Sequence, residues 1–293
     1  MPANGQDTFK SKLIDRLRQI SKGAPSPIGF GRAPEVTTAA LLLVAVIPRN
    51  DPSLAISAVK SGADAIALRI CGASTDLLTE TGDLTGEEAA IEEVSKAVGD
   101  SAIVGVIVGS NGSLSSADLR KLDGLGVDFI AAYPHLIPAT FLELSHVGRL
   151  AILDQQSGGL ARGINDLSLQ SALVRINRAN DSPPFMTITD VAGSRAAADA
   201  IHRPIIAFPS WELATDDLEV LRDAGIEGVA LVGPKPDADE AAVEKFVQQY
   251  RDVVKKLGKP TGRRNALTEA PPILPRVAAS HLPEEDEDPD EDV

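Results

Sequence analysis

The sequence predicts an α/β protein of the (β/α)8 TIM-barrel class. Eight times between Ala39 and Leu257, a short apolar run is followed by polar or glycine-containing residues and then by a helix-like stretch. Buried apolar strands that each precede a helix are typical of a parallel sheet covered by helices, and eight such units close into a barrel. A chain of 293 residues with 43% hydrophobic residues can form one barrel of the usual length, about 250 residues.

The predicted strands are rich in Val, Ile, Leu and Ala. They are Leu41–Ile47, Ala65–Ile70, Ala102–Val108, Val127–Ala132, Leu150–Leu153, Met186–Thr189, Ile205–Phe208 and Gly228–Val232. Three pairs resemble helix caps: Asp51 with Pro52, Thr85 with Glu88, and Ser115 with Asp118. Glycines in SGAD, GLGVD and DAGIEG are suited to left-handed helix ends.

The chain divides into three predicted parts. Residues 1–36 hold an amphipathic helix, Asp7–Ser21, and an extended connection; residues 37–257 form the barrel; residues 258–293 form a proline-rich, acidic tail. The composition of that tail is typical of disorder. For the helix we consider two roles, because its apolar face can plug the bottom of the barrel or pair with another copy of the chain as a homo-oligomer.

Charge and composition limit the partners. Eight acidic residues lie between Glu284 and Asp292, so the rest of the chain carries −6 of the formal net charge of −14. Without a basic stripe, nucleic acid is not an expected partner. The longest apolar run, Ala39–Ile47, is too short to span a membrane, and the amino terminus lacks an apolar signal core. We therefore expect a cytoplasmic protein whose partner is a small-molecule ligand.

In this fold, active sites lie at the carboxyl ends of the strands. Asp154 and Asp190 each end a predicted strand, so we predict catalytic roles for both in proton transfer. The alternative is that each caps its own turn. Alternation along the second strand puts Arg69 on one face with Ala65 and Ala67, inside the barrel if the small residues face inward.

Other residues at these strand ends are candidates for substrate binding. Arg69 and Arg49 can clamp an anion, or can form internal salt bridges to the two aspartates. Ser194 lies at the start of the sixth predicted helix, where free backbone N–H groups suit an anion. The remaining candidates are Asp76, Asn111 and Glu212.

Several chemistries lack the residues they need. No predicted strand contains a lysine for a Schiff base. The four histidines are scattered without ligand spacing, so no metal site is predicted, and no cofactor is indicated. The last two loops, PSWEL and VGPKPD, contain one glycine between them, which disfavours the phosphate site usual in this fold.

The segment that begins at Ala58, AVKSGADAIALRICGASTDLLTETGDLTGEEAAIEEVSKAVGDSAIVGVIVGSNGS, resembles the second and third units of pterin-binding barrels. These include dihydropteroate synthases and the methyl-transferring corrinoid protein subunits of acetyl-CoA pathways. The resemblance covers about one fifth of the chain. It implies a folate-like or methyl-transfer site, with Ser74, Thr75, Asp76 and Asn111 at the barrel mouth.

Our principal hypothesis is an aldolase-type TIM-barrel enzyme, a lyase or a transferase. It would act on a small anionic or carbonyl metabolite by carboxylate acid/base chemistry. One alternative is a non-catalytic barrel that serves as a binding or assembly module. Another is a pterin-, folate- or flavin-binding barrel. The arrangement of the mouth separates the first two. Convergence of Arg69, Asp154 and Asp190 around an open cavity would favour the enzyme, whereas side chains that pair and fill the space would favour the module.

Overall fold

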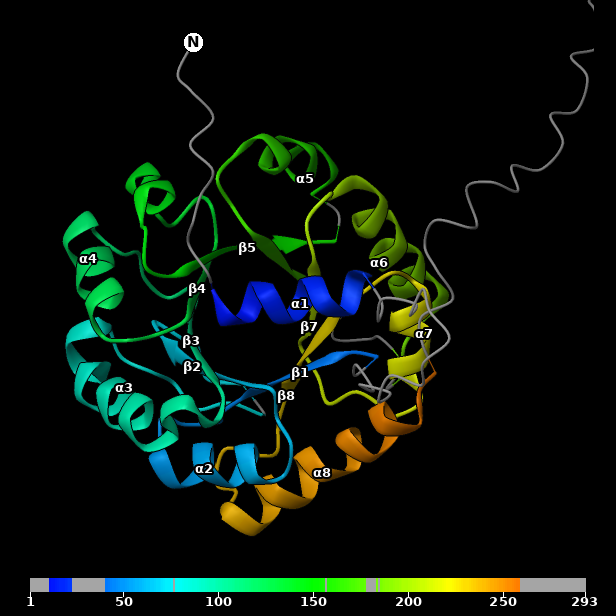
Figure 1. Cartoon of the computed structure of the whole chain (residues 1–293), viewed down its shortest axis with the longest axis horizontal. Helices are drawn as coiled ribbons and strands as arrows, with labels where there is room; N and C mark the ends of the chain where they lie inside the picture. The colour runs from blue at the N-terminus through cyan, green and yellow to red at the C-terminus, as the bar shows by residue number, and fades with distance from the viewer. Residues whose placement is uncertain are drawn as a thin grey trace, which may run out of the picture. The chain divides into compact units, whose positions relative to one another are not determined.

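The computed structural model describes residues 11–22, 40–75, 77–155, 157–177, 183 and 185–258. These residues belong to one compact unit, which spans Met1–Pro260. Eight parallel strands pair in chain order, β1 to β8, and β8 closes the barrel against β1. Helices surround the ring of strands (Figure 1). The predicted (β/α)8 TIM barrel is therefore confirmed.

The strands are β1 (Leu42–Val46), β2 (Ala65–Ile70), β3 (Ile103–Val108), β4 (Phe129–Ala132), β5 (Gly148–Asp154), β6 (Ser171–Ile176), β7 (Ile205–Pro209) and β8 (Gly228–Val232). The α-helices are α1 (Lys12–Lys22), α2 (Pro52–Lys60), α3 (Leu84–Val98), α4 (Ser116–Gly124), α5 (Gly158–Gly163), α6 (Ile188–Ala200), α7 (Asp217–Asp223) and α8 (Glu240–Lys256). Three 3-10 turns complete the described elements: η1 (Gly99–Ser101), η2 (Ala139–Glu143) and η3 (Ile164–Asp166).

One predicted strand is wrong. Met186–Thr189 leads into α6, whose N-cap is Thr187, and the sixth strand is instead Ser171–Ile176. That segment, SALVRI, differs little from AIALRI of β2: both have an arginine at the fifth position, and β6 begins with a serine where β2 begins with an alanine. The other seven strands lie where the sequence predicts them, within a few residues at their ends.

Two of the three predicted helix caps are confirmed. Asp51 accepts a hydrogen bond from the Ser53 N–H, and Ser115 forms a reciprocal capping box with Asp118. The pairing of Thr85 with Glu88 is wrong, because the N-cap of α3 is Asp83, two residues before Thr85. The predicted left-handed glycines are present, with φ of 102° at Gly62, 76° at Gly126 and 93° at Gly225.

Strand side chains alternate between two apolar cores. On β1, Leu42, Val44 and Val46 face the inner core of the barrel, whereas Leu43 and Ala45 face the outer core beneath the helices. Successive side chains of a strand point to opposite faces of the sheet, and here both faces are buried.

The inner core leaves no room at Gly105. A Cβ atom at this position of β3 would lie 2.2 Å from the ring of Phe129, which fills the centre of the barrel beside it. Ala65 and Ala67 of β2 also belong to the inner core, so the predicted inward orientation of the small residues is confirmed. Small residues on β2 and β3 thus accommodate the aromatic ring on β4.

A repeated contact fixes the start of each strand pair. Before every even-numbered strand, one side chain accepts a hydrogen bond from a backbone N–H on the preceding odd-numbered strand. The contact is reciprocal: the residue whose side chain accepts also donates its own backbone N–H to the carbonyl of the same strand residue. The four pairs are Asp64 with Leu43 (3.0 Å), Asp128 with Val104 (3.0 Å), Gln170 with Arg149 (2.9 Å) and Glu227 with Ile205 (2.8 Å). These contacts satisfy backbone groups where the strands begin.

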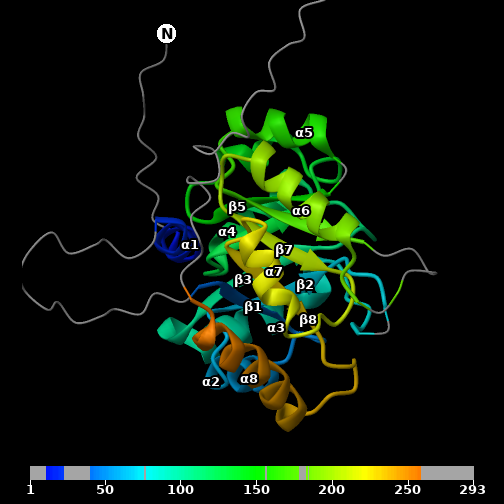
Figure 2. The same cartoon turned by 90° about the vertical axis from the view of Figure 1, so that its right-hand side faces the viewer.

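Helix α1 closes the amino-terminal end of the barrel. Its buried residues Leu13, Ile14, Leu17 and Ile20 join the inner core. The helix crosses the centre of the strand ring in Figure 1 and lies at one end of the barrel in Figure 2. The prediction that this helix plugs the barrel is confirmed. The barrel buries the apolar face that the alternative assigned to another copy of the chain, and a homo-oligomer stays a prediction.

Polar contacts position α1 over residues that precede the strands. Lys12 forms an ion pair with Asp100 (2.9 Å), and Arg16 forms one with Asp64 (3.6 Å). The Ser11 hydroxyl donates to the carbonyl of Asp128 at 3.4 Å. Burial raises the pKa of the Asp128 carboxyl group. The polar contacts therefore orient a helix that the apolar contacts hold in place.

The predicted connection before the barrel, residues 23–36, and the acidic tail from residue 259 onward lie outside the described residues. Residues 7–10, where we expected the first helix to begin, also lie outside them. Across the ranges that the structure covers, no helix combines the length and the apolar character needed to cross a membrane.

Candidate functional site

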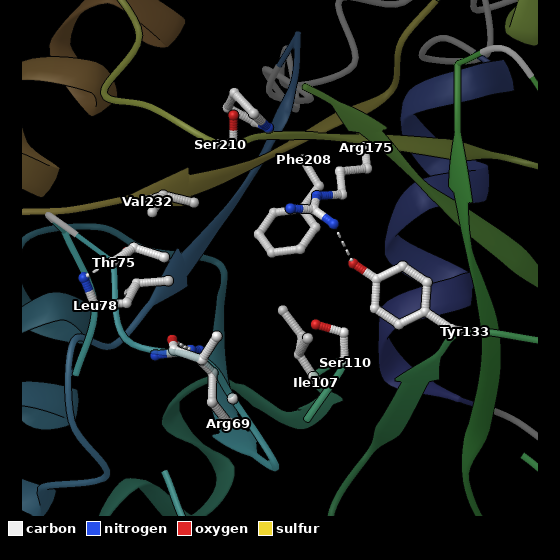
Figure 3. Close-up of a pocket in the computed structure, with 14 residues that line it drawn as sticks. Arg69, Thr75, Leu78, Ile107, Ser110, Tyr133, Arg175, Phe208, Ser210 and Val232 are labelled. Carbon is white, nitrogen blue, oxygen red and sulfur yellow. Dashed lines mark hydrogen bonds between the residues drawn. The ribbon is translucent and has the colours of Figure 1, made fainter. Parts of the chain in front are cut away.

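A cavity of about 100 Å³ opens at the carboxyl-terminal end of the strands, which we call the mouth. Side chains and backbone from six strands or the loops that follow them surround it (Figure 3). We refer to it as the mouth cavity. Its lining residues are Arg69, Gly72, Ala73, Thr75, Leu78, Ile107, Gly109, Ser110, Tyr133, Arg175, Phe208, Pro209, Ser210 and Val232.

Arg175 and Tyr133 form a hydrogen-bonded pair in this cavity. Arg175 is on β6 and points inward, and its Nη1 donates to the Tyr133 hydroxyl oxygen at 2.9 Å (Figure 3). Tyr133 follows β4 directly, and its partly buried ring packs against the inner core. Burial raises the pKa of the Tyr133 phenol, while the positive charge of Arg175 opposes that shift. The phenol is consequently protonated at neutral pH.

Arg69 also reaches the cavity, as its place on the inner face of β2 predicts. Its side chain is buried, and both terminal nitrogens bind carbonyl oxygens of the following loop: Nη1 donates to Thr79 at 2.7 Å and Nη2 donates to Ala73 at 2.8 Å. Burial lowers the pKa of this guanidinium group, and the negative charge of Glu87 opposes the shift. Arg69 thus organises the loop between β2 and α3 while it adds positive charge to the cavity.

The loop that Arg69 holds covers part of the mouth. Leu78 is buried and belongs to the inner core, so the loop inserts an apolar side chain between the strand ends. The Thr79 hydroxyl donates to the carbonyl of Pro48 at 2.7 Å, which ties the loop to the end of β1. Gly72 has little space around it, because a Cβ atom there would lie 2.4 Å from the Arg69 Nη2. The closely packed loop explains the small volume of the cavity.

The predicted partner of Arg69, Arg49, lies elsewhere. Its Nη1 donates to the carbonyl oxygens of Pro236 (3.2 Å) and Ala238 (3.0 Å), and its Nε is 3.5 Å from Asp51. These contacts join the loop after β1 to the loop after β8. The expectation that Arg49 and Arg69 clamp one anion is therefore wrong, since Arg49 does not line the mouth cavity.

Asp154 is at the rim of the mouth. It is the last residue of β5 and is exposed, as its strand-end position predicts, and it pairs in register with Arg175 on β6. Its Oδ1 accepts a hydrogen bond from Asn177 Nδ2 at 2.8 Å. The negative charge of Asp154 contributes to the raised pKa of Tyr133. The catalytic role of Asp154 stays a prediction.

Asp190 is not at a strand end, and the reason is the misplaced sixth strand. It is the third residue of α6, and its Oδ2 accepts hydrogen bonds from the Thr187 N–H and hydroxyl, both at 2.8 Å. Ser194, one turn later, is fully buried; it donates to the Asp190 carbonyl at 2.8 Å and accepts from Gln155 at 3.0 Å. Asp190 thus helps to cap a helix, which is the alternative role considered for it, although the helix is α6. Neither Asp190 nor Ser194 lines the mouth cavity.

The remaining predicted binding residues do not meet in the cavity. Asn111 is exposed, and its backbone N–H donates to the carbonyl of Cys71 at 3.0 Å. Glu212 is exposed in the loop after β7. Asp76 lies outside the described residues. Of the four residues that the resemblance to pterin-binding barrels places at the mouth, Thr75 lines the mouth cavity.

Arg175 is the functional candidate that the sequence analysis missed. It went unnoticed because the segment SALVRI was not identified as a strand. The sequence does contain a pattern that predicts its position. Side chains alternate between the two faces of a strand, so an inward arginine near the carboxyl end of a strand lies at the mouth, as Arg69 does on β2. Within the described ranges, no group of three or more His, Cys, Asp or Glu side chains could hold a metal ion.

We expect Asp190→Ala to lower the free energy of unfolding by about 1 kcal/mol, because the variant loses the capping box of α6. Ligand-induced stabilisation should be unchanged. The matched control is Asp199→Ala on the same helix, which removes only an exposed ion pair with Arg195. Urea unfolding and thermal shift measure both effects. If Asp190→Ala abolishes a ligand response that Asp199→Ala retains, the catalytic prediction for Asp190 stands instead.

Comparisons with known proteins support the fold. No protein-family model and no curated protein matches the chain. Among solved structures, thiamine phosphate pyrophosphorylase from Pyrococcus furiosus is 16% identical, with a TM-score of 0.52, over 74% of this chain and 97% of that protein. The native KDPGal structure is 15% identical, with a TM-score of 0.54, over 74% and 95%. A mutant tryptophan synthase α-subunit from Pyrococcus furiosus is 13% identical, with a TM-score of 0.53, over 75% and 98%.

At these identities, the likeness shows the fold and nothing finer. The fold is that of TIM barrels.

Proposed function

We propose that the protein is a TIM-barrel enzyme that binds a small anionic metabolite in the mouth cavity, with Arg175 as the main anion-binding residue. One observation carries the proposal. Two arginines, a phenol and the hydroxyls of Ser110, Ser210 and Thr75 line the cavity, whereas no carboxylate does so among the described residues. Guanidinium groups in a partly buried cavity favour an anionic ligand.

Arg175 is better placed than Arg69 for this role. Both terminal nitrogens of Arg69 already donate to loop carbonyls, whereas Arg175 makes one side-chain hydrogen bond within the described residues, from Nη1 to Tyr133. A guanidinium group presents five N–H donors, so Nη2 and Nε of Arg175 remain to hold an anion side by side. This is the paired geometry by which arginine binds a carboxylate.

The cavity volume supports a small ligand. At about 100 Å³, it is well below the roughly 300–1,000 Å³ typical of pockets for drug-sized molecules. It therefore favours a metabolite of a few heavy atoms over a pterin or a flavin. The apolar side chains of Ile107, Phe208 and Val232 would cover the carbon skeleton of such a ligand.

Asp154 is the carboxylate that we propose for acid/base chemistry. It lies beside Arg175 in the sheet register and is close enough to Tyr133 for its charge to act on the pKa of the phenol. An exposed carboxylate at the rim can take a proton from a carbon next to a carbonyl group, if the ligand carries one. Removal of the carboxylate would then stop proton transfer without removing the anion site.

A non-catalytic binding module is the second candidate. The small cavity favours it, since the loop that carries Leu78 occupies space that a larger substrate would need. In this case the protein binds its ligand and leaves it unchanged. The two candidates share the anion site and differ in turnover alone.

The test is a binding panel of acetate, pyruvate, acetone and inorganic phosphate, measured by thermal shift and calorimetry. We expect small carboxylates to bind and Arg175→Ala to weaken them at least about tenfold, because a charge-assisted, two-point contact is lost. Arg195→Ala, which removes an exposed arginine on α6, is the control and should bind as the wild type does. Binding that survives in Arg175→Ala would overturn the assignment of the site.

Turnover is measured in D2O by NMR, as exchange of the hydrogens next to the carbonyl group of acetone or pyruvate. The enzyme proposal predicts exchange that Asp154→Asn abolishes while binding persists. Binding without exchange in the wild type supports the non-catalytic module.

A further inference from the structure

Tyr133 has an unused hydrogen-bond donor in the mouth cavity. Its oxygen accepts from Arg175 Nη1 at 2.9 Å, so the phenolic hydrogen points to a second partner. Among the hydrogen bonds formed within the described ranges, none gives this hydrogen an acceptor. Figure 3 shows the hydroxyl directed from the β4 side toward Arg175, at the edge of the cavity. A bound ligand is the acceptor that this geometry leaves room for.

Resting on the anion site proposed above, we infer that the ligand is a small 2-oxo carboxylate, with its carboxylate on Arg175 and its keto oxygen on the Tyr133 hydroxyl. The two protein groups are in direct contact, and in a 2-oxo acid the carboxylate and the keto oxygen are on adjacent carbons. One ligand can therefore meet both groups without a spacer. Tyr133 would determine specificity, because it contacts the group that distinguishes this class from other carboxylates.

The balance of donors and acceptors supports this class. Guanidinium groups only donate, and the phenol has already used its oxygen to accept. A ligand that supplies acceptors alone, such as a carboxylate with a keto group, satisfies these donors. An amino acid would place its ammonium group among positive charges, with no carboxylate among the described lining residues to receive it. A saturated acid would offer the Tyr133 donor only an oxygen of the carboxylate that Arg175 already binds.

Burial of Tyr133 keeps the donor in its protonated form. Desolvation raises the pKa of the phenol, so the hydroxyl retains its hydrogen in the range in which a carboxylate ligand is ionised. In a water-poor site, an unsatisfied donor costs more than one in open solvent. Discrimination against a ligand that lacks the keto oxygen therefore follows from the same geometry that binds the keto acid.

The experiment compares pyruvate, propionate and L-alanine, which share three carbons and differ at the second. Calorimetry on the wild type should show pyruvate binding at least about fivefold more tightly than propionate, because propionate loses one buried hydrogen bond. L-Alanine should bind most weakly. Tyr133→Phe should bring pyruvate to the level of propionate and leave propionate within about twofold of its wild-type affinity. Arg175→Ala should weaken pyruvate and propionate alike.

The outcomes separate the two proposals. If Arg175→Ala binds all three compounds as the wild type does, the anion site itself is wrong. If Arg175→Ala weakens binding but the wild type does not prefer pyruvate, or Tyr133→Phe keeps that preference, the anion site stands and the inference about 2-oxo acids is overturned. The wild-type comparison needs no variant, so it decides the question even if Tyr133→Phe folds poorly.

Discussion

Replacing Leu17 by alanine is expected to lower the free energy of unfolding by about 2–5 kcal/mol, the range for removing a large buried apolar side chain. Leu17 is completely buried, at 0% exposure, and belongs to the inner core that α1 shares with the strands. The strands of a closed barrel cannot move inward to fill the space, so the site relaxes little. We therefore expect a loss toward the upper end of that range.

The control is Arg18→Ala, the next residue along α1, whose side chain is exposed. It should change the free energy of unfolding by no more than about 0.5 kcal/mol. Urea unfolding followed by circular dichroism measures both variants, and hydrogen exchange in α1 shows whether the helix detaches alone or with the barrel. Equal stability of the two variants would mean that α1 does not seal the barrel.

Replacing Arg69 by alanine should cost roughly 3–5 kcal/mol of stability, because two hydrogen bonds from a charged donor are lost at once. The carbonyl oxygens of Thr79 and Ala73 would lose their partners in a region with little water. Gly72 and Thr81 pair across the same loop, since the Gly72 N–H donates to the Thr81 hydroxyl at 2.9 Å and the Thr81 N–H to the Gly72 carbonyl at 3.0 Å. Loss of Arg69 should expose both amides to exchange.

Hydrogen exchange at the Gly72 and Thr81 amides checks this directly, alongside urea unfolding. Arg69→Lys is the matched variant, because it keeps the charge but cannot reach two carbonyls as a planar guanidinium does, and it should recover part of the stability. An anion clamp would behave differently: Arg69→Ala would then lose ligand binding while stability and amide protection persisted. That result would contradict the loop-organising role.

The sequence predicts most of the fold because strands and helices here obey local rules. The strands β2 and β8 lie at the predicted residues, Ala65–Ile70 and Gly228–Val232. β8 is an uninterrupted apolar run, and β2 is apolar apart from Arg69. The prediction misses β6 because it assigns Met186–Thr189 as the sixth strand, although SALVRI of β6 has an arginine at its fifth position just as AIALRI of β2 does. Met186–Thr189 resembled a strand in composition, but the capping box of Thr187 and Asp190 starts a helix there.

The candidate site was less predictable, because it depends on which strand end each side chain occupies. Arg69 was placed correctly from alternation along a single strand. Its hydrogen bonds to Thr79 and Ala73 depend on the path of a long loop, which no local pattern specifies. Arg175 is on β6, and Tyr133 directly follows β4. These strands are not adjacent, so the contact between the two side chains follows from the curvature of the closed barrel rather than from any sequence motif.

The most direct measurement is a crystal structure of the full chain grown with pyruvate. We expect density in the mouth cavity, with the carboxylate within hydrogen-bonding distance of Arg175 and the keto oxygen within that distance of the Tyr133 hydroxyl. An empty mouth cavity at a saturating pyruvate concentration, or density only against Arg49 or another surface arginine, would contradict it.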